Sequence, residues 1–146
     1  MAPFRGQYSR HSALTRRAYI YFLEIAAHLF AVVEMHHILP RQVLAFIDNQ
    51  PGQTALLKGY GRDPTINNVL AVYWSVVSQL QLDIHLEWVK SDLNISDAVS
   101  RHDVRQAHEL RWQLRELDRS RFFQVLLRAS ADLDYACSLA AYDLLH

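Results

Sequence analysis

The stretch Ile84-His-Leu-Glu-Trp-Val-Lys-Ser-Asp-Leu-Asn-Ile-Ser-Asp-Ala-Val-Ser-Arg101 contains a strand pattern, a loop and a helix start in succession. Residues 84–89 follow an alternating apolar and polar pattern, which is the period of a half-buried strand. Asn94 or Ser96 can then cap a helix by accepting hydrogen bonds from its first N–H groups. Asp97 is therefore expected in the first turn of that helix, where a carboxylate is electrostatically favoured. In α/β folds, a strand followed by an acid at the next helix brings chemistry to one edge of the sheet.

The composition indicates one compact domain with a substantial core. The chain has 146 residues, of which 51% are hydrophobic, and this length is sufficient to bury a core. Lysine plus arginine equals aspartate plus glutamate at 15 each, so no overall field favours nucleic acid or a membrane surface. The single cysteine, Cys137, excludes an internal disulfide and is typical of a reducing compartment. Glutamates and histidines break the apolar run 18–39, which favours a buried helix over a membrane span.

Positive charge is concentrated near the N-terminus. Before Glu24 the chain has no acid, and it has four arginines there: Arg5, Arg10, Arg16 and Arg17. We interpret residues 1–18 as a basic arm, because they show no apolar periodicity. Such a start is typical of an organelle transit segment, mitochondrial for example, but an arm that grips a partner fits the same residues. The expected location is intracellular in either case.

The rest of the chain up to the quoted stretch alternates between helical and strand patterns. The uninterrupted apolar run 43–47 predicts a strand covered on both faces, whereas the alternating strand is expected nearer the edge of the sheet. Pro40 is expected to end the first helix, and Pro51-Gly52 to turn the chain after the first strand. The expected elements are helices over 19–39, 54–58 and 67–80 and strands over 43–47 and 84–89. Two strands joined by helices predict an α/β fold in which helices dominate by residue count.

The last third of the chain is expected to form a helical extension, residues 104–146. Apolar residues recur at spacings of three and four over 104–117 and continue over 122–127 and 133–145, with breaks near Ser120 and Ser130. Five arginines fall broadly on another face of the first of these helices: Arg101, Arg105, Arg111, Arg115 and Arg119. Because acids interrupt this row, we interpret it as a solvated face with ion pairs and not as a phosphate-binding surface.

Three acids stand in comparable positions. Glu24 lies on the inner part of the first helix, Asp48 ends the apolar strand, and Asp97 opens the later helix. Buried or half-buried acids at strand ends are costly unless they are paired or hold a metal ion. Clustered carboxylates suit Mg²⁺ or Mn²⁺, and two such ions can activate a water molecule and stabilise the leaving oxygen of a phosphodiester.

Other candidate side chains have plainer interpretations. Three histidines lie near Glu24 in the sequence, but their spacing matches no closed four-ligand zinc site: His28, His36 and His37. The three tryptophans are interpreted as core or interface anchors and not as base-stacking platforms: Trp74, Trp88 and Trp112.

Several short motifs, in consistent order over about residues 19 to 103, resemble the ribonuclease H domain of retroelement reverse transcriptases, with the DIRS-type elements as the nearest match. The motifs are Tyr21-Phe-Leu-Glu24-Ile-Ala-Ala, Phe46-Ile-Asp48-Asn49, Ala55-Leu-Leu-Lys-Gly59, Glu87-Trp-Val-Lys-Ser91 and Asn94-Ile-Ser-Asp97-Ala-Val-Ser-Arg101. The resemblance implies a site in which four acids bind two divalent metal ions and cut the RNA strand of an RNA–DNA hybrid. It places Glu24 on the first helix, Asp48 at the end of the fourth strand and Asp97 at the start of the last helix.

The chain also departs from the family. The family carries its first acid on the first of three antiparallel strands that precede the helix with Glu24, and residues 1–18 contain no acid and are too short for three strands. We therefore expect a truncated ribonuclease H-like core over 19–103. An open edge is expected on strand 43–47, and another protein chain is expected to cover it.

Two functions follow from these expectations. The first is a non-catalytic subunit of a larger assembly, derived from such a domain. The alternative is metal-dependent cleavage of RNA in RNA–DNA hybrids, with Glu24, Asp48 and Asp97 as Mg²⁺ or Mn²⁺ ligands and the missing acid supplied by another chain. The subunit function is preferred for the chain alone, because loss of one ligand disturbs a shared two-metal site.

Overall fold

The computed structural model describes residues 16–48, 50–58, 63–90, 93, 101–113 and 118–146. The basic arm, apart from the first residues of the first helix, lies outside this part, and so does Asp97. The described elements are α2 (Arg16–Met35), β1 (Gln42–Ile47), α3 (Gln50–Lys58), α4 (Pro64–Gln79), β2 (Asp83–Trp88), α6 (Arg105–Glu109), α7 (Ser120–Ala131), α8 (Leu133–Ser138) and α9 (Ala140–Leu145). None of the described helices is long and apolar enough to cross a membrane.

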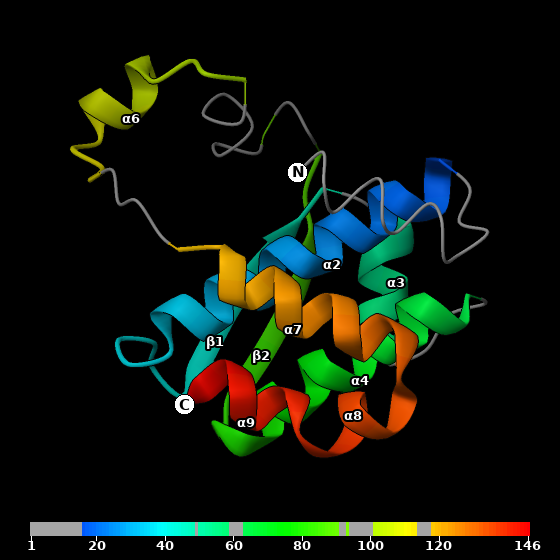
Figure 1. Cartoon of the computed structure of the whole chain (residues 1–146). Coiled ribbons are helices and arrows are strands. Elements are labelled where there is room, and N and C mark those ends of the chain that lie inside the picture. The colour runs from blue at the N-terminus through cyan, green and yellow to red at the C-terminus, as the bar shows by residue number, and fades with distance from the viewer. Residues whose placement is uncertain (1–15, 49, 59–62, 91–92, 94–100, 114–117) are drawn as a thin grey trace.

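The two described strands form a parallel sheet, joined by α3 and α4 (Figure 1). Val43 is aligned with Ile84 and Ile47 with Trp88. Parallel strands need a crossover connection, and the two helices between them provide it. The predicted α/β arrangement of two strands linked by helices is therefore confirmed as a helix-rich fold with a small parallel sheet.

Helix α4 is the central packing element. Its N-cap is Asp63, whose carboxylate accepts a hydrogen bond from the backbone N–H of Thr65 at 2.8 Å, and Pro64 occupies the first helical position, where no N–H is needed. Its apolar residues are buried on one broad face: Ile66, Val69, Leu70, Val72, Tyr73, Val76 and Val77. The helix contacts α2 on one side and α7, α8 and α9 on the other. One core cluster therefore runs from α2 to the C-terminal helices.

Specific contacts fix the C-terminal helices to the rest of the chain. The ring of Phe122 in α7 meets the ring of Phe30 in α2 edge to face, with centroids 5.0 Å apart. The side chain of Asn68 in α4 donates a hydrogen bond to the backbone carbonyl of Ser130 at 3.0 Å. Residues 118–146 therefore pack as part of the same core as α2 and α4.

The expectation that the first strand is covered on both faces was wrong. Burial alternates along β1: Ile47 is buried, whereas Leu44 and Phe46 are 57% and 54% exposed. The described helices pack on the face that carries Ile47 and Leu86, and α2 and α7 pass in front of the sheet in Figure 1. The continuous apolar run therefore reflects one buried face and one outward apolar face.

Two expected helices have different bounds for local reasons. The helix expected over 54–58 begins at Gln50, because Pro51 lies in its first turn, where a missing N–H costs nothing. The helix expected over 104–117 ends at Glu109. There the N–H groups of Arg111 and Trp112 bond to the carbonyls of His108 and Ala107, and Arg111 takes the left-handed conformation with φ 58° that ends a helix.

Candidate functional site

Glu24 and Asp48 interact electrostatically although they are far apart in sequence. Glu24 is half-buried on α2, and Asp48 is half-buried directly after β1. Burial raises the pKa of Glu24, and the negative charge of Asp48 raises it further. The structure therefore brings together two of the three acids singled out in the sequence. The third, Asp97, lies outside the described residues.

His28 is a further member of this group. It lies one helical turn after Glu24 on α2, so both side chains point from the same face of the helix. Burial lowers the pKa of His28, and the charge of Asp48 partly opposes this shift. Asp48 therefore acts on both residues of α2. The four-residue spacing of His28 from Glu24 is the sequence signal for this proximity.

The two carboxylates of this group are of the ligand type that hard divalent cations prefer. Two carboxylates close enough to raise a pKa repel each other when both are ionised, and a bound cation removes that repulsion. In the part of the chain that the structure describes, no group of three or more His, Cys, Asp or Glu side chains is arranged to hold a metal ion. Glu24 and Asp48 would supply the oxygen ligands for Mg²⁺ or Mn²⁺.

The two histidines that directly follow α2 are engaged in local contacts. The Nδ1 atom of His36 lies 2.6 Å from the backbone carbonyl oxygen of Val33, one turn earlier. The ring of His37 packs edge to face on that of His36, with centroids 5.8 Å apart. His36 therefore lies against the last turn of α2, and His37 lies against His36.

The backbone of β1 has one paired edge and one open edge. The carbonyls of Arg41 and Ile47 accept hydrogen bonds from Asp83 (2.7 Å) and Val89 (3.0 Å), so the odd-numbered residues face β2. In a parallel strand the alternate residues direct both backbone groups to the other side. Those residues are Gln42, Leu44 and Phe46, and no described strand pairs with them.

The far edge of β2 has a side-chain partner. The backbone carbonyl of Leu86 points away from β1, and the Nε2 amide of Gln53 in α3 donates a hydrogen bond to it at 3.2 Å. Helix α3 also contacts β2. Among the described residues the two outer edges of the sheet therefore differ, because the edge of β2 has this side-chain hydrogen bond and the edge of β1 pairs with no strand.

The outward face of the sheet combines apolar and acidic residues. We call it the outer sheet face and define it by Gln42, Leu44, Phe46, Asp83, His85 and Glu87. The apolar side chains lie on β1, and the acids lie on β2, where the imidazole of His85 contacts the carboxylate of Glu87 at 2.6 Å. No lysine or arginine belongs to this face. An apolar stripe next to an acidic stripe is typical of a docking surface.

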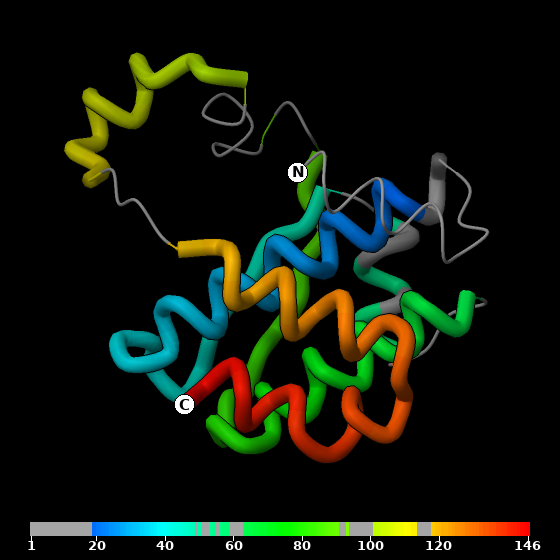
Figure 2. The backbone as a smooth tube through the Cα atoms, viewed as in Figure 1, coloured from blue at the N-terminus to red at the C-terminus, as the bar shows by residue number. Residues whose placement is uncertain are grey.

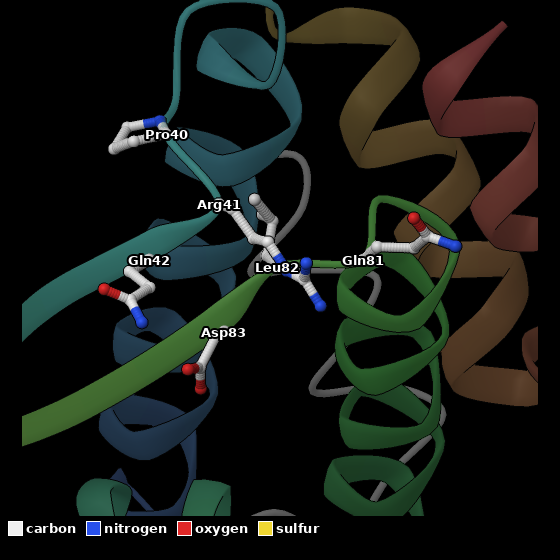
Figure 3. A pocket seen from close by; sticks show the side chains of 6 residues that line it. All are labelled: Pro40, Arg41, Gln42, Gln81, Leu82 and Asp83. Atoms are coloured by element: carbon white, nitrogen blue, oxygen red, sulfur yellow. The ribbon is translucent and has the colours of Figure 1, made fainter.

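A hollow lies at the opposite end of the strands from Asp48 (Figure 3). It is lined by Pro40, Arg41, Gln42, Gln81, Leu82 and Asp83. Parallel sheets of α/β proteins bind ligands at the carboxyl ends of their strands, whereas this hollow lies at the amino ends. It is therefore separate from the group formed by Glu24, His28 and Asp48.

The three tryptophans differ in how far they are exposed to solvent. Trp74 is half-buried, and its Nε1–H donates to the carbonyl of Leu56 at 2.9 Å, so it is a core anchor as predicted. Trp88 and Trp112 are 39% and 43% exposed.

In the row of arginines over 101–119, Arg105 forms an exposed ion pair with Asp103 at 2.9 Å and lowers the pKa of that carboxyl to about 2.

No family model, curated protein or solved structure matches the chain.

Proposed function

We propose that this chain is a non-catalytic subunit of a larger protein assembly, derived from the ribonuclease H-like domain of a retroelement, and that it joins the assembly through β1. One observation carries the proposal. No described strand pairs with the outer edge of β1, and the outward face of β1 is apolar, whereas Gln53 bonds to the Leu86 carbonyl on the far edge of β2. A surface with unpaired backbone groups and exposed apolar side chains is stabilised when another chain covers it.

The open edge offers specific groups to a partner strand. Leu44 is the central one of the three residues whose backbone groups point to that edge, Gln42, Leu44 and Phe46. It presents its backbone N–H and C=O to the edge and its side chain to the outer sheet face. A partner strand would bond to these backbone groups. The side chains of Leu44 and Phe46 form a separate apolar surface beside this edge.

The test removes one donor from the open edge. Leu44→Pro deletes an N–H that does not bond to β2, so the chain should still fold, since proline is tolerated on an edge strand. Leu133→Pro is the matched control, because Leu133 is an exposed leucine at the first position of α8, where proline is tolerated. Tagged full-length chains are expressed in the cells that make the protein, and their elution is compared by size-exclusion chromatography.

The wild-type chain and Leu133→Pro are expected to elute at the mass of an assembly, and Leu44→Pro at a smaller mass, outside the assembly. Circular dichroism and a thermal melt check that both variants are folded. Elution of the wild type as a monomer, or of folded Leu44→Pro with the assembly, would show that β1 is not the attachment site.

The electrostatic coupling of Glu24 and Asp48 favours a second candidate function. In this alternative the two acids, with Asp97 and an acid from a partner chain, hold Mg²⁺ or Mn²⁺ and cut RNA in RNA–DNA hybrids. Purified chain is incubated with a labelled hybrid and either metal ion. Cleavage that Asp48→Asn abolishes and Asp83→Asn leaves intact would replace the subunit proposal with this one. Asp83 is the control because it is an exposed acid on the same sheet.

A further inference from the structure

Residues 101–113, which we call the α6 segment, lie apart from the rest of the chain (Figures 1 and 2). No residue of α6 is buried, and none of the segment's apolar side chains packs against the core cluster. Three large apolar residues of the segment are exposed: Val104 (46%), Leu110 (49%) and Trp112 (43%). A helix of five residues is too short to persist in water without tertiary contacts. The segment therefore needs a surface to pack on.

The outer sheet face has the complementary properties. It exposes Leu44 and Phe46 beside a row of acids. The α6 segment has three arginines and two acids, and the outer sheet face has two acids and no arginine or lysine. Both surfaces expose apolar side chains, and their net charges have opposite signs. The two surfaces are therefore complementary.

We propose that the α6 segment docks on the outer sheet face of a second copy of this chain. The proposal names the partner of the face described above, and so it rests on the proposed role of the chain as an assembly subunit. In a two-fold dimer each chain gives its segment and receives the other, so two contacts form for a single loss of translational and rotational freedom. Trp112 is the expected anchor, because a tryptophan that inserts into an apolar surface contributes most to such interfaces.

The test uses purified full-length chains in sedimentation velocity over a range of concentrations. Trp112→Asp damages the segment, and Phe46→Asp damages the face. Leu133→Asp is the matched control, because Leu133 and Phe46 are both 54% exposed. The wild type and the control are expected to form dimers, and each of the other two variants is expected to raise the dimer dissociation constant by roughly tenfold or more.

Mixing the two damaged variants gives the decisive result. In the mixture the intact segment of Phe46→Asp meets the intact face of Trp112→Asp, so a mixed dimer with one sound contact is expected. Variants that remain monomeric when mixed would overturn the exchange. This experiment leaves the backbone groups of the β1 edge unchanged, so its failure is distinct from a failure of Leu44→Pro to release the chain.

A cross-link identifies the chain that the segment touches. Leu44→Cys and Leu110→Cys are combined with Cys137→Ser, which removes the exposed natural thiol, and the protein is oxidised. A covalent dimer on a non-reducing gel supports the proposal, and an internal cross-link in a monomer overturns it. Tight, Trp112-dependent binding of an RNA–DNA hybrid by a chain that stays monomeric would also overturn it, and would assign the segment to nucleic acid.

Discussion

Gln53→Leu tests whether the far edge of β2 is closed by a specific hydrogen bond. The substitution removes the donor that bonds to the Leu86 carbonyl at 3.2 Å and replaces it with a side chain of similar helix propensity. A neutral hydrogen bond contributes about 0.5–1.5 kcal/mol, and this one is near the long end of the usual range. Because Gln53 is half-buried, water can replace only part of the bond. We therefore expect the free energy of unfolding to fall by about 1 kcal/mol, which for a chain of this size lowers the Tm by roughly 2–4 °C.

Urea unfolding at pH 7, followed by circular dichroism, measures this change. Gln50→Leu is the control, because Gln50 lies in the same helix, is exposed and should change stability by less than about 0.5 kcal/mol. Gln53→Leu should also self-associate more at high concentration, since it opens a second sheet edge. Unchanged stability together with unchanged association would refute the conclusion that Gln53 protects this edge.

Three further predictions concern the helix end and the acid group. Gln81 follows α4 with φ 54°, so Gln81→Gly should stabilise the chain by about 1 kcal/mol in urea unfolding; Gln79→Gly, at the last residue of the helix, should not stabilise it. Asp48→Asn removes a charge that raises two pKa values, so NMR titration should show lower pKa values for both Glu24 and His28; an unchanged Glu24 would contradict the coupling. The pKa of Glu24 is raised in the folded chain, so its ionisation costs stability once the pH exceeds the ordinary value. Glu24→Gln should therefore raise the Tm at about pH 7 and leave it unchanged near pH 3, and the opposite pH dependence would refute the assignment.

The features that could be predicted from sequence depend on local periodicity. The alternating pattern of 84–89 predicted β2 to within one residue, because a half-buried strand imposes a period of two. Helices α2 and α4 were also expected, since their apolar residues recur at helical spacing, although both begin three residues earlier than expected. Asp63 and Pro64 form the cap and the first helical position of α4, so the helix begins before its apolar periodicity does.

The features that could not be predicted from sequence depend on contacts between distant segments or on an unusual backbone angle. An apolar run such as 43–47 looks the same whether one face or two are covered, and the open face of Leu44 and Phe46 appears only in three dimensions. The end of α6 depends on the left-handed conformation of Arg111, which a non-glycine residue does not signal. The proximity of Glu24 and Asp48 was inferred from a family resemblance, and their electrostatic coupling follows from the packing of α2 near the end of β1.

The position of Gln53 also limits how many neighbours the sheet can take. A sheet with two unpaired edges could add strands from further copies without limit, as chains do in a fibril. Here the Leu86 carbonyl on one edge is held by Gln53 of α3, so strand addition is favoured on the β1 side. The protein would then form one end of any row of strands that it joins.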